Sequence, residues 1–522
     1  MAMSRLFQTL ARFLGNRRGN VAMIFALSLL PVTLLSGGAV DLSQAMNARS
    51  RLAQALDAAA LAVGVNTSLS NDDALDIAND FIAANYPGRE LGTVTNVTVS
   101  IDDESDTVTV RGEARVRTTM LGLAGIDYIT VHWESEVQRA RQRLELVMVL
   151  DNTGSMGGSK IRSLRSSAEL LTEILFEAAD ETGDVRIGLV PFAATVNVGT
   201  QHERVWWLDP DALSPQHAEW AGGTVEVETC TGRGRGRGRG GRRCETEEIR
   251  VNHWDLFDQV RNAAWQGCVE ARLPPYDIDD TPPSVGNPAT LFVPYFSPDE
   301  PDIGGYSNDY LSDGIGGGVT ERLRNLLKYD GAWTSEYRTN RSCTTTPVTP
   351  LTTNRRQIEN AISDMDASGT TNIPNGIGWG VRVISPGEPF TEGVSYADDE
   401  VIKAMVILTD GDNVMSGRNT DLMSDYEAYG YAVDGRLGVR SSSRRVLSRA
   451  LDDRTEAACD YAKSLGIRVY TITFQVSSSS TRDLMRNCAS HSSLYFDSPS
   501  DEALEDAFEM IAGDLTGLRL SR

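Results

Sequence analysis

A run of 20 residues without a charged side chain, at positions 21–40, is the feature that most constrains this chain. As a helix it would be about 30 Å long, which matches the hydrocarbon core of a bilayer. Asp41 follows the run, and four arginines precede it, at positions 5, 12, 17 and 18. Basic residues stay on the cytoplasmic side. We therefore expect a cytoplasmic segment at 1–20, a transmembrane helix at 21–40 and the remaining chain outside.

Two alternatives exist for this run. A cleaved signal peptide would use the small residues Gly37, Gly38 and Ala39. The run is longer than the usual apolar segment of a signal peptide, about 7–15 residues, so we favour an uncleaved anchor. A buried helix of a soluble protein is disfavoured by the basic flank and the N-terminal position.

The charge balance argues against a nucleic-acid partner. The chain has 49 Lys and Arg against 72 Asp and Glu, for a net charge of −23. No general positive field attracts phosphates, and the acidic surface serves solubility first. The run GRGRGRGRGGRR at 232–243 is an exception. Such runs bind RNA in some proteins, but in an exported chain we interpret it as a solvated loop between Cys230 and Cys244.

Residues 41–142 predict a helical segment followed by a small α+β unit. Apolar residues form one stripe over 42–63, and a second helix is expected at 72–85. Alternating apolar and polar residues predict strands at 94–101, 107–116 and 128–137. Helices and strands of this length build a unit of about one hundred residues.

Residues 143–522 predict an α/β domain with a doubly wound, mainly parallel sheet, because buried strands alternate with helices. Strands are expected at 144–150, 185–192, 403–408, 467–474 and 494–496, and helices at 160–178, 355–365, after 374, at 445–464 and from 501. The alternation breaks between about 199 and 350. This stretch holds four of the six cysteines and six of the eight tryptophans, and we interpret it as a long insertion.

Hard oxygen donors follow the expected strand ends. Asp151, Thr153 and Ser155 come directly after the first strand of this domain, Thr371 precedes a helix, and Asp410 ends another buried strand. Ligands of open α/β sheets bind at the carboxyl edge of the strands. Two carboxylates and three hydroxyls suit a divalent cation, Mg²⁺ first, with Ca²⁺ or Mn²⁺ as alternatives. A set of ordinary helix caps would explain each loop singly but not their convergence.

These residues resemble the metal-ion-dependent adhesion site of von Willebrand factor A domains. That family has Asp-x-Ser-x-Ser on the first loop, Thr on the second and Asp on the third. The pattern maps onto Asp151, Thr153, Ser155, Thr371 and Asp410, with a hydroxyl retained where Thr153 replaces Ser. Thr370 is an alternative to Thr371, but the Asn after Thr371 fits the family spacing better. The resemblance implies a Rossmann-like fold and a metal whose open coordination position takes a carboxylate from an Asp or Glu of a partner protein.

Enzymatic motifs are missing from the sequence. The five histidines form no HExxH pair, and neither a GxSxG nucleophile elbow nor a GxxxxGK[ST] phosphate loop occurs. We therefore expect a binding protein and not an enzyme.

The N-terminal segment is similar to Tad (tight adherence) pilus-assembly proteins of the TadG type. The similarity covers roughly residues 15–65, from Arg17-Arg18-Gly19-Asn20 through DLSQAMNARSRLAQALDAAALA. Ile24 stands where a processed pilin has Glu five residues after its Gly. The resemblance implies a single-pass protein of the bacterial inner membrane, with its body in the periplasm or at the cell surface, that serves Flp pilus assembly or adhesion. The alternative is a chelatase-like scaffold for an enzyme complex, which would be cytoplasmic.

The even number of cysteines is compatible with disulfides in an exported chain. We predict a Cys459–Cys488 bond, because both residues lie on elements that flank the strand at 467–474 and Tad-like proteins have similarly placed cysteines. Two buried free thiols are the alternative. The other four cysteines allow three pairings, of which we prefer Cys230–Cys244 with Cys268–Cys343.

Overall fold

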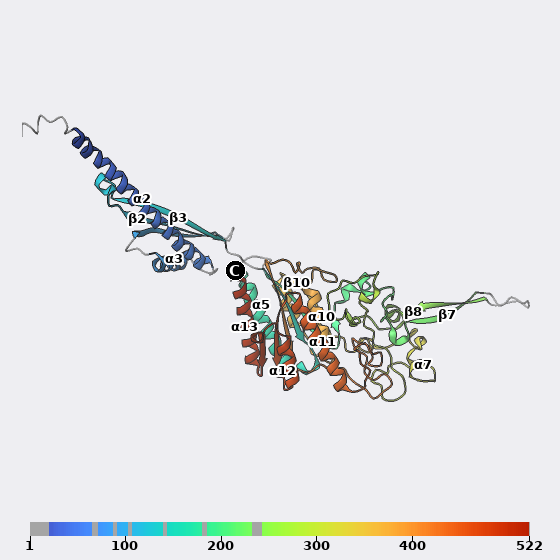
Figure 1. Cartoon of the computed structure of the whole chain (residues 1–522). Helices are drawn as coiled ribbons and strands as arrows, with labels where there is room; N and C mark the ends of the chain where they lie inside the picture. The colour runs from blue at the N-terminus through green and yellow to red at the C-terminus, as the bar shows by residue number, and fades with distance from the viewer. Residues whose placement is uncertain are drawn as a thin grey trace, which may run out of the picture. The chain divides into compact units, whose positions relative to one another are not determined.

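The computed structural model describes residues 20–64, 71–86, 91–102, 107–138, 143–179, 185–231 and 243–520. The chain divides into two compact units. Unit 1 comprises Met1–Arg141 with Leu520–Arg522, and unit 2 comprises Gln142–Arg519 (Figure 1). The structure has the mixed α/β composition, with one apolar helix near the N-terminus, that the sequence predicts.

Unit 1 is built around one long helix. Its elements are α2 (Asn20–Gly64), α3 (Asn71–Asn85), β1 (Thr93–Asp102), β2 (Thr107–Arg117), the 3₁₀ turn η2 (Leu121–Ala124) and β3 (Tyr128–Gln138). The strands form an antiparallel sheet in the order β1-β2-β3. The second half of α2 packs on this sheet, where Leu52 and Leu56 meet the buried side chains of β2.

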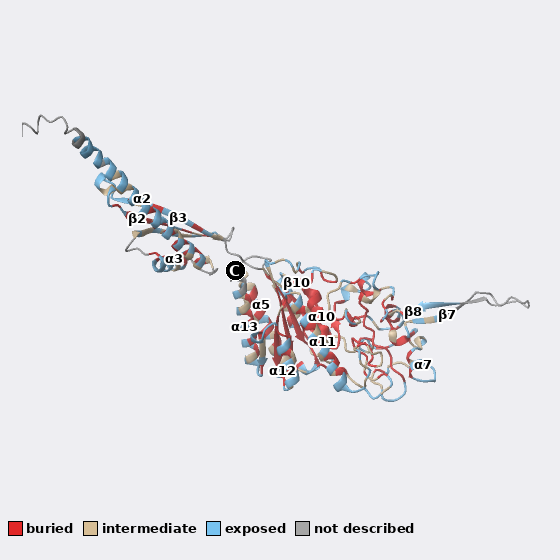
Figure 2. Cartoon of the chain, viewed as in Figure 1, coloured by how far each residue is buried: buried red, intermediate tan, exposed pale blue. Residues whose placement is uncertain are grey.

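The first half of α2 is exposed and apolar (Figure 2). Its most apolar stretch has a mean hydropathy of 2.0 and is only 6% buried. Among the described residues, α2 alone is long and apolar enough to cross a membrane by length and composition. The helix continues through Pro31 and on to Gly64, so the apolar run and the following amphipathic segment form one element.

Unit 2 contains an eight-stranded sheet. Its strands are β4 (Arg143–Asp151), β5 (Val185–Phe192), β6 (Val196–Asn197), β9 (Cys268–Val269), β10 (Thr349–Thr352), β11 (Val401–Thr409), β12 (Arg468–Phe474) and β13 (Tyr495–Ser498). The order is β13-β12-β11-β4-β5-β6-β9, with β10 antiparallel to β5. The five strands from β13 to β5 are parallel, as runs of apolar residues buried on both faces favour.

Helices cover both faces of this sheet. One face packs against α10 (Ile373–Ile384), α11 (Arg444–Ser464) and α12 (Ser479–Cys488). The other packs against α5 (Ser159–Glu177), α9 (Arg355–Ser363) and α13 (Asp501–Leu520). Alternate residues of each strand pack into the hydrophobic cores on opposite faces of the sheet. Val147 and Val149 of β4 face the first set of helices, and Leu146 and Met148 face the second.

The predicted insertion has little regular structure but shares the core of the sheet. Its elements are β7 (Thr224–Thr231), β8 (Arg243–Arg250), α6 (His253–Gln259), α7 (Val319–Leu323) and α8 (Glu336–Thr339), besides β9 and short 3₁₀ turns. Buried aromatic side chains of this stretch, such as Trp254 and Phe292, belong to the same hydrophobic cluster as Trp379 of α10. The insertion is therefore packed onto one face of the domain.

Two of the predicted disulfides are confirmed. Cys459 of α11 is bonded to Cys488 of α12, and Cys268 of β9 is bonded to Cys343. Cys230 and Cys244 are opposite each other in the backbone register of β7 and β8. Their side chains, and the loop at 232–242, lie outside the described residues.

A buried ion pair joins the two central strands. Glu145 of β4 and Lys403 of β11 are register partners, both are buried, and the Lys403 ammonium lies 2.5 Å from the Glu145 carboxylate. The same carboxylate accepts a hydrogen bond from the Val394 amide.

Glu145→Leu should lower the free energy of unfolding by about 3–5 kcal/mol, because it leaves the Lys403 ammonium buried without a counter-charge. The double variant Glu145→Leu/Lys403→Met should recover most of that loss, since an apolar pair can replace a buried ion pair. Urea unfolding of the three proteins measures both effects. A double variant no more stable than Glu145→Leu would contradict this account.

Candidate functional site

The two predicted carboxylates meet at the carboxyl edge of the sheet. Asp151 is the last residue of β4, and Asp410 directly follows β11, its parallel neighbour. From β4 the chain continues through α5 to β5, on the opposite side from β11. The carboxylates therefore lie where the strand order reverses, which is where open α/β sheets bind their ligands.

Backbone hydrogen bonds hold the three predicted loops together. The amide of Gly154 donates to the carbonyl of Gly369 (3.0 Å), and the amide of Ser368 donates to that of Asn152 (2.8 Å). The second loop is tied to the third, because the Val414 amide donates to the Thr371 carbonyl at 2.8 Å. Loops far apart in the sequence thus form one compact surface.

A chain of hydroxyl groups connects the carboxylates of Asp151 and Asp410. The Thr153 and Ser155 hydroxyls lie 2.9 Å apart, and the Ser155 hydroxyl donates to Asp410 at 2.6 Å. Asp151 accepts from the Thr153 amide (2.8 Å) and the Thr409 hydroxyl (2.7 Å). Four of the five predicted residues are therefore in one hydrogen-bonded cluster. Sequence reasoning missed Thr409, which belongs to the same strand end.

The fifth residue, Thr371, is buried beside this cluster. Its hydroxyl forms no hydrogen bond within the described part of the chain. The hydroxyl of the alternative, Thr370, donates to the buried Glu427 carboxyl at 3.0 Å. Burial raises the pKa of Glu427 to about 7. Thr370 therefore serves the packing of the loop at 411–443, and Thr371 remains the better candidate.

Burial and a like charge act on Asp151. Its side chain is fully buried, and this burial, together with the negative charge of Asp410, raises its pKa to about 6. Hydrogen bonds from Thr153 and Thr409 oppose the rise. Two carboxylates confined in this way repel each other when both are ionised.

Lys160 supplies a positive charge that the sequence prediction did not include. Its ammonium, on the first turn of α5, lies 2.6 Å from Asp410, whose side chain is fully buried. Lys160 follows Asp151 closely in the sequence, so its long cationic side chain lies at the start of the helix that follows the first loop. That pattern could have indicated the pairing.

The donor set fits a hard divalent cation. Its oxygens come from two carboxylates and from hydroxyls, and the Met156 thioether next to Ser155 is buried in the apolar core. The described residues contain no cluster of three or more His, Cys, Asp or Glu side chains able to hold a metal. Besides the two carboxylates, a cation here would need the hydroxyls of Thr153, Ser155 and Thr371 as ligands.

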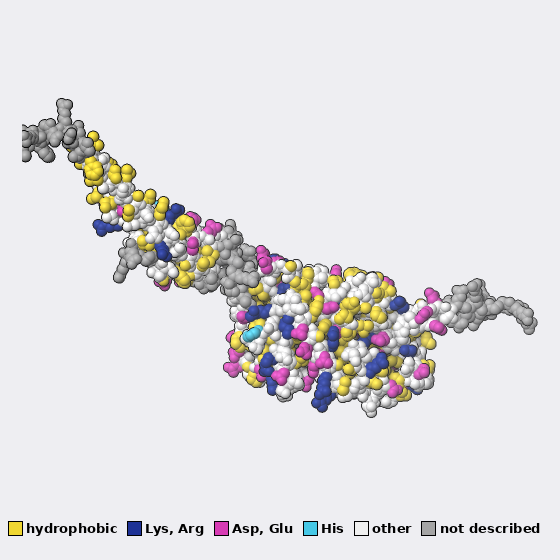
Figure 3. Space-filling view, in the orientation of Figure 1, with side chains coloured by type: hydrophobic (Ala, Val, Ile, Leu, Met, Phe, Trp, Pro, Cys, Tyr) yellow, Lys and Arg dark blue, Asp and Glu magenta, His cyan; other side chains and the backbone are white. Residues whose placement is uncertain are grey.

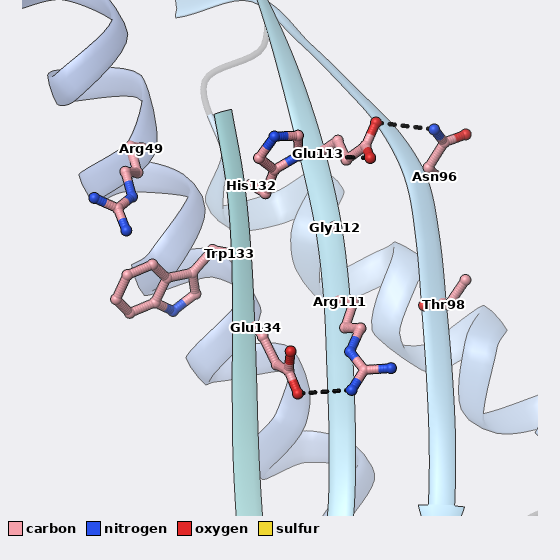
Figure 4. A pocket seen from close by; sticks show the side chains of 9 residues that line it. All are labelled: Arg49, Asn96, Thr98, Arg111, Gly112, Glu113, His132, Trp133 and Glu134. Carbon is pink, nitrogen blue, oxygen red and sulfur yellow. Dashed lines mark hydrogen bonds and ion pairs between the residues drawn. The ribbon is translucent and has the colours of Figure 1, made fainter. Parts of the chain in front are cut away.

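Unit 1 has an open pocket of 620 Å³ of its own (Figure 4). Its polar side chains pair with one another: Arg111 forms an ion pair with Glu134 at 2.8 Å, and the Asn96 amide donates to Glu113 at 2.9 Å. The Arg49 guanidinium lies 5.2 Å from the centre of the Trp133 ring. These groups satisfy each other at an exposed surface, so the pocket is a weaker candidate than the three loops.

Two histidines of the insertion are buried and paired. His217 is 2.8 Å from the Asp209 carboxylate and accepts from the His253 amide at 2.9 Å. Burial lowers the pKa of His253 well below its usual value, so its ring stays neutral. Both side chains are inaccessible to solvent, and we interpret the pair as part of the core.

Comparison with known proteins adds one finding for the N-terminal segment. A family model described as "Putative Flp pilus-assembly TadE/G-like" matches residues 19–66, which cover α2. This agrees with the predicted Tad resemblance of that segment. No match was found among curated proteins.

Several solved structures of pilus proteins overlap with the chain. The vWF domain of the type V pili tip protein Mfa5 from Porphyromonas gingivalis has 10% identity and a TM-score of 0.34, over 73% of this chain and 97% of that one. The pilus adhesin SpaC from Lactobacillus rhamnosus GG has 11% identity and a TM-score of 0.32, over 81% of this chain. This chain spans 34% of the length of SpaC.

Asp151→Asn should stabilise the metal-free protein at alkaline pH. Folding raises the pKa of Asp151 from 3.8 to about 6, so the folded state holds this proton more tightly and loses stability as pH rises between these values. The variant should be more stable than the parent by up to about 3 kcal/mol at about pH 8, with the gain vanishing near pH 4.

Urea unfolding in chelator at several pH values measures this difference. Asp506→Asn, which changes an exposed carboxylate on α13, is the matched control and should show no gain. A destabilised Asp151→Asn at pH 8, or a gain independent of pH, would contradict the prediction.

Proposed function

We propose that unit 2 is a von Willebrand factor A domain that binds a divalent cation, Mg²⁺ first, through Asp151, Thr153, Ser155, Thr371 and Asp410. The hydrogen-bonded cluster of Asp151, Thr153, Ser155 and Asp410 at the strand-order reversal is the observation that supports it most. A cation there would relieve the repulsion between the two carboxylates. Bound in this way, it would supply a Lewis-acidic position for a carboxylate of a partner protein.

The burial pattern of the site residues indicates from which side a partner protein would approach the cluster. Asp151 and Thr153 are buried, whereas Ser155 is exposed. A partner's Asp or Glu would therefore reach the cluster from the side of Ser155. The residues hold and orient the cation without reacting, so the proposal is a binding protein and not an enzyme.

We place this binding function in Flp pilus assembly or adhesion at the bacterial inner membrane. The TadE/G-like match of residues 19–66 and the apolar first half of α2 support it. The chain would cross the membrane once, with its basic N-terminus in the cytoplasm.

Mg²⁺ should raise the Tm of the parent protein by mass action, and that of Asp151→Ala and Asp410→Ala much less. Thr371→Ala should have an intermediate response, because it removes one neutral donor. Thermal unfolding with Mg²⁺ and with chelator measures this, with Asp506→Ala as the control that keeps the full response. Equal responses of Asp151→Ala and the parent would show that the loops are only helix caps.

Lys160→Met separates cation binding from general destabilisation in the same experiment. Without metal, it leaves Asp410 without its counter-charge, and the Tm should fall below that of the parent. With Mg²⁺ the rise in Tm should be larger than in the parent, since no ammonium competes for Asp410. A smaller rise would mean that Lys160 supports the cation instead of competing with it.

Capture of partners from detergent-solubilised envelope should depend on Mg²⁺ and on the carboxylates of the site. The parent chain should retain one or more envelope proteins in Mg²⁺ and release them in chelator. Asp410→Ala should lose the same proteins while Asp506→Ala retains them. Retention by Asp410→Ala, or in chelator, would contradict binding through the cation.

Alkaline phosphatase, which is active only after export, should be active when fused to the C-terminus. The arginines before the apolar run keep the N-terminus inside and so place the body outside. A cytoplasmic reporter at the same position should be inactive. The reverse result, with the chain in the cytosolic fraction, would favour the chelatase-like alternative.

A further inference from the structure

The turn between β2 and β3 exposes four large apolar side chains. Residues 118–128 include η2 and the first residue of β3, and four of their apolar side chains are exposed: Met120, Leu123, Ile126 and Tyr128. Leu123 is 79% exposed, and Asp127 is the single charged residue of the segment. Contiguous exposed apolar side chains of this kind mark contact with a protein or a membrane.

Hydrogen bonds fix this turn to α2 at the end of the apolar run. The carboxylate of Asp41 is buried and accepts from the amides of Thr119 (3.0 Å), Met120 (2.8 Å) and Leu121 (2.8 Å). The turn is therefore held beside α2 at a fixed position along the helix, next to Asp41 (Figure 1).

Two glycines of α2 allow the close approach. A Cβ atom at Gly37 would lie 2.3 Å from the Met120 side chain, and one at Gly38 would lie 3.2 Å from Leu121. The turn thus lies against the last helical turn of the run at 21–40. Leu35 and Val40 of α2 are also exposed, and hydrophobic side chains cover this helix toward its N-terminal end (Figure 3).

We propose that residues 119–128 form a lipid-contacting loop, inserted into the interface of the leaflet in which the transmembrane part of α2 ends. This rests on the proposed membrane anchor. A helix of 20 residues spans the hydrocarbon core, so Asp41 and the turn lie at the boundary. The exposed apolar side chains of the turn are continuous with the membrane-spanning surface of α2. This continuity favours lipid over a second protein as the group that the turn contacts.

The polar groups around the turn suit the same interface. Tyr128 is exposed, and the Arg115 guanidinium lies 5.3 Å from the centre of its ring. Tyrosine is enriched at membrane interfaces, and arginine reaches from there toward phosphate groups. Together with α2, the loop gives unit 1 a second contact with the bilayer and so restricts its tilt.

A photo-crosslinking amino acid at Leu123 of the full-length chain tests the loop. The protein is reconstituted in vesicles of phosphatidylethanolamine and phosphatidylglycerol, irradiated and digested with trypsin. We expect a phospholipid adduct on the peptide 118–139. The same substitution at Leu61, a 58% exposed leucine about 30 Å further along α2, should give no lipid adduct.

The probe at Leu29, an exposed position within the apolar run, distinguishes the loop from the anchor. Lipid adducts at Leu29 and Leu123 but not at Leu61 support the proposal. Lipid adducts at Leu29 alone, or a protein adduct at Leu123, overturn the loop and leave the anchor intact. No lipid adduct at Leu29 overturns the anchor and the loop with it.

Discussion

Asp151 and Asp410 bring two negative charges together at the ends of the two central strands. The rest of unit 2 depends on how these charges are compensated. Two carboxylates with buried side chains cost free energy unless positive charge or hydrogen-bond donors face them. The loops supply hydroxyls from Ser155 and Thr409, and α5 supplies the ammonium of Lys160. All four carboxylate oxygens accept a hydrogen bond, but one ammonium faces two carboxylates. Burial and the negative charge of Asp410 therefore still raise the pKa of Asp151.

The scaffold holds these groups by packing on both sides of the sheet. Gly376 and Gly380 let α10 approach closely, because a Cβ atom at either position would lie 2.6 Å from Phe192 or Val149. Far from the site along the same two strands, Glu145 and Lys403 form a compensated buried pair. The central strands therefore have a neutralised pair near their beginning and an incompletely neutralised pair at their end. The proposed cation would bind at the second pair.

Sequence patterns predicted the regular elements of unit 1 and most of those of unit 2 outside the insertion to within about three residues, because apolar runs and alternation report burial directly. The short strands β6 and β10 were not predicted. Sequence patterns also predicted Asp151, Thr153, Ser155 and Asp410, which meet where the two central strands end, since strand ends are fixed by topology. They did not predict Lys160, whose long side chain reaches Asp410 from another element. Sequence patterns did not predict the packing of the insertion either. Its Trp254 and Phe292 belong to the same buried cluster as Trp379 of α10, and no helical or strand period of the insertion indicates this. The turn at 118–128 was missed because its contact with Asp41 is made across 78 residues.

The most direct test of the central claim is the anomalous scattering of Mn²⁺ in crystals of unit 2 soaked with MnCl₂. The account predicts a single strong peak in contact with Ser155 and enclosed by Asp151, Thr371 and Asp410, with the Lys160 ammonium moved away from Asp410. The peak should be absent from crystals of Asp410→Ala. A peak elsewhere, or unchanged Lys160–Asp410 pairing with no peak at saturating Mn²⁺, would contradict a cation site at the three loops.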